Sequence, residues 1–466
     1  MAVFVGAWGV NQFTPMATVY RLDEHWSSLR VAAMFSIYLL GLLPALLWGG
    51  PASNRHGRKI VKHALLLSCC ASLLLSAATP FGELGQTAVF ISRFVTGLSC
   101  GVILSAGTAW VGELSVGHGP PGAGARRATL TAAGGFGGGA LASGIMMQFL
   151  PYPAIIPVLV HAALTLGAYF ALRGLPDGVP PHLVPHGKRG VNWEAIRHPR
   201  FRRIVLPAGP AVFAAATVAY VVLPSLVADK VASYAPLFSG IVAAVTLGVG
   251  IISQPIAVRI DREGSARAIL FALIMVVIGL CVGAWAAAWD SPGLVVFAAA
   301  WLGSGYGLVL AAGLREMERL APKDGLSSAT SIYQGLAHGG LLTPLLLALG
   351  SGAAPYPVLL VSMAVLGVVI VGLAALASSI LRTRHAHQEE VRQRGAARGR
   401  GHVRGSGGSP PPPPEESSSY PTTPSSAGSL TDSESASAAS EGASAPKVRS
   451  VSDTGRDLGG SPSAEH

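Results

Sequence analysis

One charged residue, Arg93, stands well inside a long apolar stretch of the chain. A charge at the centre of a membrane-spanning helix costs at least about 2.5–3.5 kcal/mol on insertion scales, so a residue of this kind is usually functional. Arg93 could contact a substrate or set the pKa of a nearby proton carrier. The structural alternative is that it ties its helix to a neighbour through polar side chains, with Asn11, Gln12 and Gln148 as the candidates.

Other polar side chains also lie within apolar stretches. His161 and His338 do so, and because imidazole titrates near pH ~6.5, each could carry a proton or serve as a hydrogen-bonded packing residue. The amides of Asn11 and Gln12, close to Pro15, need hydrogen-bond partners in such a setting. Carboxylates fall only near the ends of the stretches, so a carboxylate proton relay has no candidate.

The sequence lacks the patterns of catalytic and metal-binding sites. The glycine run GGFGGGA is not followed by the Lys-Ser/Thr of a phosphate-binding loop, and there is no H-E-x-x-H, nucleophile elbow or paired carboxylate. The four cysteines have no C-x-x-C spacing, and they are interpreted as small packing residues. The prediction is a protein that is not an enzyme and holds no metal or cofactor.

The elements that position these residues follow from the composition. Half of the residues are hydrophobic and only 12% are charged, with a mean hydropathy of +0.50, whereas soluble chains carry about 25% charge. A membrane span needs about 20 mostly apolar residues. Such runs predict an all-α integral membrane protein in the lipid bilayer with twelve spans, at 4–20, 30–50, 60–80, 88–113, 128–150, 152–173, 204–226, 236–257, 268–288, 293–314, 328–349 and 358–381.

Basic residues set the orientation of these spans. Up to Arg384, 21 basic residues lie on the side of the two termini and three, Arg21, Arg30 and Lys230, lie on the other side. Because loops rich in basic residues remain on the cytoplasmic side, both termini are expected in the cytoplasm. The expected location of the protein is a plasma or inner membrane. The net charge of +10 is therefore assigned to loop orientation and not to nucleic-acid binding.

Composition also divides the chain into parts. The Pro- and Arg-rich cytoplasmic loop 174–203 separates two groups of six spans, which predicts six-helix halves at 1–173 and 204–384. The segment 385–466 is rich in Ser, Ala, Gly and Glu, so it is predicted to be a disordered cytoplasmic tail. Its arginines could contact anionic lipids, or the tail could be solvated without an essential role.

An internal repeat supports two related halves. Asn54-Arg55-x-Gly57 matches Asp261-Arg262-x-Gly264 at an offset of 207, in the loops after spans 2 and 8. The segment Gly101 to Gly107 of span 4 matches Gly307 to Gly313 of span 10 at an offset of 206. Two six-helix halves of this kind commonly surround a central substrate site.

The loop after span 2 carries a family resemblance. It reads GPASNRHGRK and resembles the G-x-x-x-D-R-x-G-R-[RK] motif of the major facilitator superfamily, with Asn54 in place of Asp. The resemblance covers about 4–381. We expect Gly50 to permit close helix approach and Gly57 to permit a tight turn. The resemblance implies a latch that holds the outward-open state, weakened here by the missing charge and formed by Gly50, Asn54, Arg55, Gly57, Arg58 and Glu113.

Two further motifs are similar to those of the superfamily. Arg93-x-x-x-Gly97-x-x-x-Gly101 in span 4 places its residues on one helix face, and in the family this arginine faces the central cavity and is linked to coupling. Span 5 resembles the exporter motif G-x-x-x-G-P-x-x-G-G through Gly135, Gly139 and Gly144, with Ala140 for Pro and Ser143 for Gly. The alternative for span 5 is a glycine-rich packing face.

The family fold also ranks the polar candidates. Spans 1 and 11 border the cavity in this family, whereas span 6 tends to be peripheral, which favours His338 over His161 as the coupling residue. Asn11 and Gln12 are either substrate contacts or interhelical hydrogen-bonding groups. The full set of substrate-contact candidates implied by the resemblance is Asn11, Gln12, Tyr220 and Gln334.

The resemblance implies a monomeric secondary transporter that moves a small-molecule substrate by alternating access, with protons as the coupling ion. The span 5 motif and the few charges favour efflux, as in a drug or metabolite antiporter. The alternative is a proton-coupled uptake permease, for which an anionic metabolite would suit Arg93. A membrane sensor or scaffold that uses the tail, and a membrane-embedded enzyme, are the remaining classes.

Overall fold

The computed structural model describes residues 1–78, 82–115, 117–118, 123–175, 196–262, 265–321 and 326–405. The regular secondary structure in these ranges is helical throughout, so the predicted all-α class is confirmed. The chain divides into two units, Met1–Gly399 and Arg400–His466, and the second is described only as far as Gly405. The middle of the predicted central loop, 176–195, and the predicted tail after 405 lie outside the described residues.

The first predicted span consists of two helices that meet at Gln12. They are α1 (Ala2–Asn11) and α2 (Phe13–Leu22). Pro15 accounts for the break, because proline has no N–H to donate to the carbonyl group four residues earlier, that of Asn11. The break lies next to the two amides that the sequence places in this span.

The remaining N-terminal helices follow in chain order. They are α3 (Ser28–His56), α4 (Lys59–Ala78), α5 (Gly82–Val102), a π-helical turn (Ile103–Gly107), α6 (Thr108–Leu114), α7 (Ala123–Phe149) and α8 (Ile156–Ala171). The side chain of Ser27 caps α3 by accepting a hydrogen bond from the Arg30 backbone nitrogen at 3.3 Å. Gly57 ends this helix with a φ of 74°, a conformation that glycine adopts without strain.

The C-terminal helices begin with an irregular segment. It comprises a π-helical turn (Phe201–Val205), α10 (Leu206–Ala208), α11 (Ala211–Thr217), a second π-helical turn (Val218–Val222), α12 (Leu223–Leu226) and a 3-10 helix (Ala228–Tyr234). Longer helices follow: α13 (Ala235–Ile260), α14 (Arg267–Ala288), α15 (Pro292–Leu320), α16 (Leu326–His338), a 3-10 turn (Gly339–Leu342), α17 (Thr343–Gly350) and α18 (Tyr356–Gly405).

Ten helices of the described chain are long and apolar enough to cross a membrane, and they coincide with ten of the predicted spans. The other two predicted spans hold shorter helices, namely α1 and α2 with 10 residues each and α8 with 16. Helix α18 extends beyond the predicted span 358–381 and ends at Gly405, because no proline follows Pro357 until position 410 and the chain can remain helical.

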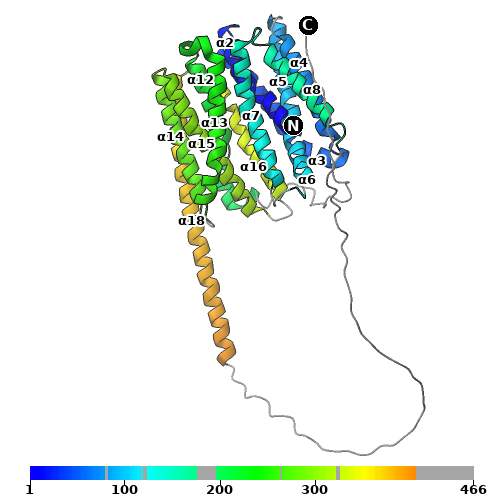
Figure 1. Ribbon diagram of the computed structural model, residues 1–466. Coiled ribbons are helices and arrows are strands. Elements are labelled where there is room, and N and C mark those ends of the chain that lie inside the picture. The colour runs from blue at the N-terminus through cyan, green and yellow to red at the C-terminus, as the bar shows by residue number, and fades with distance from the viewer. Residues whose placement is uncertain are drawn as a thin grey trace, which may run out of the picture. The chain divides into compact units, whose positions relative to one another are not determined.

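Helices close in sequence pack on one another in two groups. Among the N-terminal helices α3 packs on α5, and among the C-terminal helices α13 packs on α15 (Figure 1). Glycines permit both approaches. A Cβ atom added to Gly97 of α5 would overlap the carbonyl oxygen of Tyr38, and one added to Gly303 of α15 would overlap that of Thr246. These two glycines are 206 residues apart, the offset of the internal repeat.

Helices α7 and α13 form the main contact between the N-terminal and C-terminal helices, and they stand side by side in Figure 1. Gly144 and Gly240 lie at this crossing, and a Cβ atom on Gly144 would be 2.7 Å from the carbonyl oxygen of Pro236. Gln148 Nε2 donates to the Ser233 carbonyl at 2.8 Å, and Arg21 Nη1 donates to the Ser225 carbonyl at 3.0 Å. These contacts lie near the helix ends that are predicted to be at the outer face of the membrane.

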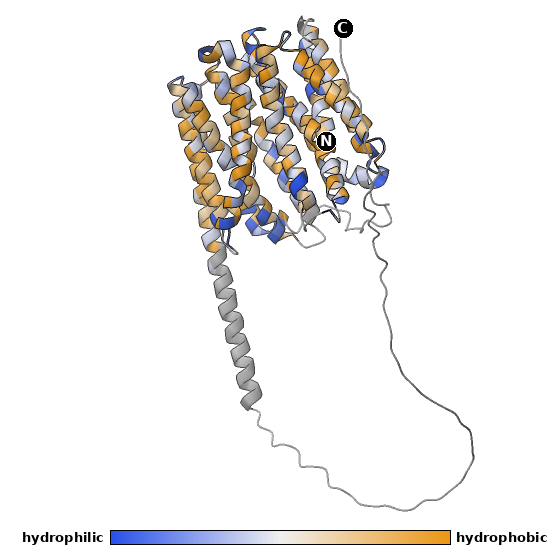
Figure 2. Ribbon diagram, viewed as in Figure 1, coloured by the Kyte–Doolittle hydropathy of each residue, from blue (hydrophilic) through white to orange (hydrophobic). Residues whose placement is uncertain are grey.

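The outer faces of the helices are apolar. Figure 2 shows hydrophobic residues along the length of the helices, with hydrophilic residues gathered mainly at their ends. Large hydrophobic side chains on α18 are about half exposed, as expected for contact with lipid. Aromatic side chains near the predicted outer boundary are also exposed, which fits the aromatic belt of a membrane interface: Phe149, Tyr152, Trp285 and Trp289.

Candidate substrate and coupling site

Arg93 lies at the centre of an aromatic cluster. Its side chain is 1% exposed, and Nη1 donates to the Val10 carbonyl oxygen at 3.3 Å. The guanidinium carbon lies 4.3 Å from the ring centroid of Phe13, 5.2 Å from that of Tyr38 and 6.0 Å from that of Phe35. Cation–π attraction stabilises a buried cation in this arrangement by about 1–2 kcal/mol for each close ring.

Two donors of this guanidinium are unsatisfied. Nε and Nη2 of Arg93 are buried and have no hydrogen-bond partner among the described residues. Among the described residues, Arg93 forms no hydrogen bond with the side chains predicted as its structural partners, those of Asn11, Gln12 and Gln148. Burying a charged donor without a partner costs free energy. The edge of the guanidinium that carries Nε and Nη2 is therefore an exception that calls for an explanation.

Helix geometry brings the cluster together. Phe13 begins α2 directly after the break at Gln12, and the Arg93 contact to Val10 joins α5 to the end of α1. Phe35 and Tyr38 are three residues apart on α3 and therefore share a face. The close α3–α5 approach at Gly97, one turn after Arg93, holds that face against the guanidinium. The glycine motif of span 4 thus positions its own arginine.

The two amides of span 1 differ in their environments. Asn11 Nδ2 donates to the Phe136 carbonyl of α7 at 3.3 Å, so this side chain is an interhelical bridge. Gln12 is 2% exposed, and its Oε1 has no partner among the described residues. Gln12 therefore has a buried, unpaired acceptor that a substrate could use.

An aromatic series continues from the Arg93 cluster into the C-terminal helices. The rings of Phe35 and Tyr220 meet edge to face at 6.4 Å, and Tyr220 lies on the π-helical turn Val218–Val222. Tyr220 is also close enough to Tyr306 to interact with it electrostatically. The ring of Phe213 lies 5.7 Å from Tyr306 and 4.4 Å from His338. Arg93 and His338, two of the predicted residues, thus lie at opposite ends of one aromatic series.

The hydrogen bonds of His338 leave one ring nitrogen available as a base. Nδ1 lies 2.6 Å from the Gln334 carbonyl oxygen, and because a carbonyl oxygen only accepts, Nδ1 must carry the proton. The neutral ring therefore has its lone pair on Nε2. Gln334, a predicted substrate contact, acts here through its backbone. Its neighbour Tyr333 donates to the Val309 carbonyl at 2.8 Å and ties α16 to α15.

His161 has both ring nitrogens engaged. Nε2 donates to the Val5 carbonyl at 2.9 Å, and Nδ1 lies 2.7 Å from the Ser72 hydroxyl, which must then donate to it. Gly9 packs directly on the imidazole. His161 therefore joins α8 to α1 and α4 as a packing residue, in agreement with the preference for His338 as proton carrier.

The loop after α3 carries an ion pair. Nε of Arg58 donates to Glu113 Oε2 at 3.0 Å, and Nη2 donates to the second carboxylate oxygen, so the pair is bidentate. Nη1 donates to the Ser53 hydroxyl. Arg58 is 7% exposed, whereas Arg55 is exposed to solvent. Arg58 and Glu113, two of the residues assigned to the latch, are thus in contact, while the side chain of Asn54 lies outside the described residues.

The interpretation of Gly50 as a point of close helix approach is wrong. A Cβ atom added there would meet no atom within 4 Å, whereas one added to Gly49 would overlap the Ser105 hydroxyl. Gly50 instead precedes Pro51 inside α3, a position where proline disfavours the helical conformation of a residue with a Cβ atom. The neighbouring Gly49 provides the close approach to the π-helical turn Ile103–Gly107.

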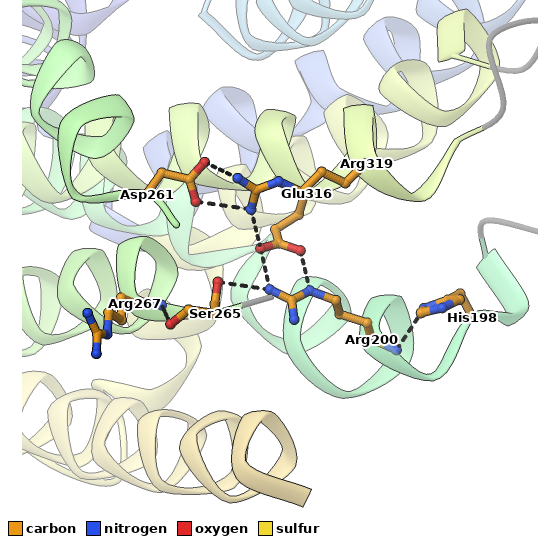
Figure 3. A network of polar contacts seen from close by, with 7 residues as sticks. All are labelled: His198, Arg200, Asp261, Ser265, Arg267, Glu316 and Arg319. Carbon is orange, nitrogen blue, oxygen red and sulfur yellow. Dashed lines mark hydrogen bonds and ion pairs between the residues drawn. The ribbon is translucent and has the colours of Figure 1, made fainter. Parts of the chain in front are cut away.

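The C-terminal helices carry a larger ion-pair network that the sequence did not predict (Figure 3). Arg200 holds Glu316 through Nε at 2.5 Å and Nη2 at 2.7 Å, and also donates to the Ser265 carbonyl at 2.9 Å. Arg319 holds Asp261 at 2.5 Å and 3.1 Å and reaches Glu316 at 3.4 Å. Hydrogen bonding to Glu316 raises the pKa of Arg200, so this arginine stays charged. Of the residues in this network, only Asp261 is singled out by the sequence, as part of the internal repeat.

The glycines of span 5 are packing positions. A Cβ atom on Gly135 would overlap the Phe4 carbonyl of α1, and one on Gly139 would lie 2.7 Å from Trp8 Cα. Gly144 faces α13, as described above. Helix α7 therefore uses one glycine-rich segment to pack on the first span and on the C-terminal helices. Gly101 of span 4 likewise packs on α3, since a Cβ atom added to it would lie 2.7 Å from the Leu42 carbonyl oxygen.

A multi-pass bundle of apolar helices, with a buried cation inside it and ion pairs near one end, is the architecture expected of a membrane transport protein. The family model for the Major Facilitator Superfamily matches residues 1–344. The chain belongs to this superfamily, and it is accordingly a transporter and not an enzyme.

Solved transporter structures share the fold. A nucleoside transporter, NupG, matches with a TM-score of 0.62 at 11% identity over 81% of this chain and 96% of that chain. A POT family transporter in complex with 5-aminolevulinic acid matches with a TM-score of 0.64 at 13% identity, over 82% and 96%. A bacterial homologue of the human lysosomal transporter Spinster, inward-facing and unoccupied, has a TM-score of 0.59 at 13% identity, over 82% and 96%. No curated protein sequence matches the chain.

Proposed function

We propose that the chain is a proton-coupled secondary transporter that exports a small molecule by alternating access between two six-helix halves, 1–173 and 204–384, with twelve spans in all. The observation that carries the proposal is the buried Arg93, whose unsatisfied donors lie where the N-terminal and C-terminal helices meet through Phe35 and Tyr220. A charge kept in such a place serves a ligand or a coupled ion more readily than it serves packing.

Rocking of the halves is supported by two observations. The close pairs α3–α5 and α13–α15 use glycines at the repeat offset, as expected for homologous halves. The hydrogen bonds that join the N-terminal helices to the C-terminal ones lie near the predicted outer ends, whereas the Arg58–Glu113 and Arg200–Glu316 pairs each bind helices of the same half. This distribution suits a state that is closed outside and opens toward the cytoplasm.

The orientation follows from the basic residues. With both termini in the cytoplasm, both ion-pair clusters lie at the cytoplasmic face, and the exposed aromatic belt lies at the outer face. A plasma or inner membrane is the proposed location. The tail after 405 would then extend into the cytoplasm.

Proton coupling is assigned to His338. Its Nε2 carries the lone pair, and its ring contacts that of Phe213 in a tilted arrangement at the end of the aromatic series that begins at Arg93. No carboxylate of the described chain lies at the middle of a span, so the imidazole of His338, with Nε2 free to accept a proton, is the group assigned to carry it. Protonation of His338 would place a second positive charge in the series.

Export is favoured over uptake by the glycine segment of α7, which resembles the exporter motif and packs against both α1 and α13. Uptake of a small metabolite is the second candidate, and the unsatisfied edge of Arg93 favours it if the substrate is an anion. The two directions differ in where substrate accumulates when a proton gradient is imposed.

The test is a flux assay in reconstituted vesicles with a substrate panel, with and without a proton gradient. Export predicts gradient-dependent loss of substrate from right-side-out vesicles, and accumulation inside them would establish uptake instead. A His338→Gln variant should lose the gradient dependence, whereas His161→Gln should keep it at reduced yield. Absence of flux for every compound in folded protein would contradict the proposal.

A further inference from the structure

The same structure shows twice how this chain holds a carboxylate. Arg58 binds Glu113 through Nε and Nη2, and Arg200 binds Glu316 through the same two nitrogens. These two N–H groups lie on one edge of the planar guanidinium and point in parallel, which matches the two oxygens of a carboxylate.

Arg93 presents this same edge without a partner. Nη1 is used by the Val10 carbonyl, while Nε and Nη2 have no acceptor among the described residues. The described carboxylates belong to residues near the ends of the spans, and those that are paired already have arginines. Among the described residues no carboxylate is left for this edge, and a carboxylate supplied by a ligand would fit it.

The surroundings of this edge decide between an inorganic and an organic anion. Phe13, Tyr38 and Phe35 surround the guanidinium, and Tyr220 continues the aromatic surface. A small hydrated anion would lose its water here and gain only the hydrogen bonds to Arg93, whereas an organic anion would also pack its apolar body on the rings. Tyr20, which interacts electrostatically with Arg93, and Gln12, next to Phe13 in the chain, have buried polar atoms without partners, Tyr20 OH and Gln12 Oε1, that could add polar recognition.

We propose that Arg93 binds the carboxylate of a small organic monoanion through Nε and Nη2, with the apolar part of that anion packed against Phe13, Phe35, Tyr38 and Tyr220. This substrate class rests on the proposed transport function and narrows it. One end of the transported molecule is then a carboxylate and the rest of it is apolar.

The experiment compares acids with their uncharged amides. Purified full-length protein is titrated with matched pairs of increasing apolar size: acetate and acetamide, butyrate and butyramide, benzoate and benzamide, and phenylacetate and phenylacetamide. We expect the acid to bind more tightly than its amide by about ten- to a hundred-fold, the gain from hydrogen bonds to a charged group, and the benzoate and phenylacetate pairs to bind more tightly than acetate.

Variants connect this preference to the arginine. Arg93→Gln should remove the preference for acid over amide, and Arg93→Lys should retain only part of it, because an ammonium group lacks the parallel pair of donors. Arg126→Gln is the matched control, since Arg126 is an exposed arginine at the start of α7. Size-exclusion profiles identify variants that fail to fold, and the acid–amide comparison in the wild-type protein does not depend on them.

The outcomes separate this inference from the proposed function. If no acid binds more tightly than its amide, or if Arg93→Gln keeps the preference, the carboxylate assignment is wrong. Gradient-driven flux of uncharged compounds together with that result would leave the transport function intact. Arg93-dependent binding of acids without flux under any gradient would instead retain the site and refute the transport function.

Discussion

The close packing of α5 on α3 at Gly97 should determine both the stability of the protein and the geometry of its arginine. An added Cβ atom would overlap the Tyr38 carbonyl oxygen, so in a Gly97→Ala variant α5 must move away from α3 by on the order of 1 Å. Overpacking of this kind costs about 1–3 kcal/mol. The same movement separates Arg93 from the Tyr38 ring and from Phe35.

Gly167→Ala is the control, because an added Cβ atom on this glycine of α8 would meet no atom within 4 Å. Alanine is the better helix former by up to about 1 kcal/mol, so this variant should melt at the wild-type temperature or slightly above it. Thermal melting in detergent and flux in vesicles would be compared for both variants. We expect Gly97→Ala to melt several degrees lower and to transport more slowly. Wild-type melting and wild-type flux in Gly97→Ala would refute the account of this packing.

Three further predictions concern the latch, the proton carrier and the orientation. Arg58→Gln should impair switching between states without preventing folding, and Asn54→Asp should strengthen the outward-open state. Both effects are measured by the accessibility of cysteines at the two ends of the bundle. If neither variant changes this accessibility, the loop serves only to orient the protein through its positive charge. His338→Gln should abolish the response of flux to a pH gradient, whereas His161→Gln should lower the melting temperature and keep that response, because His161 joins three helices. Cysteines at position 190 should be labelled only from the cytoplasmic side and those at position 230 from outside, and labelling of 190 from outside would reverse the topology.

Much of the fold could be predicted from the sequence because lipid imposes a simple rule. Every span must be apolar over about 20 residues, and ten of the predicted ranges coincide with helices that meet this requirement. The same rule conceals the site. Aromatic residues such as Phe13 and Phe213 are apolar whether they face lipid or the interior, so nothing in the pattern separated them from the lipid-facing residues.

Polar residues were found individually and their partners were not. Arg93 and His338 were recognised because a charge or an imidazole is rare in a span, but the Val10 carbonyl that holds Arg93 is a backbone group without any sequence signal. The Arg200–Glu316 pair joins residues 116 positions apart at helix ends, where charges are common. Gly50 was misinterpreted because the motif suggested close approach, while the adjacent Pro51 explains the glycine locally.

The most direct test of the central claim is proton-gradient-driven flux in vesicles that contain the wild-type protein, Arg93→Lys or Arg93→Ala, each at a measured level of folded protein. If Arg93 serves transport, Arg93→Ala should reach the membrane and melt near the wild-type temperature while its flux collapses, and Arg93→Lys should fall between the two. If Arg93→Ala fails to accumulate in the membrane, or accumulates and transports at the wild-type rate, the assignment of Arg93 as the functional centre is contradicted.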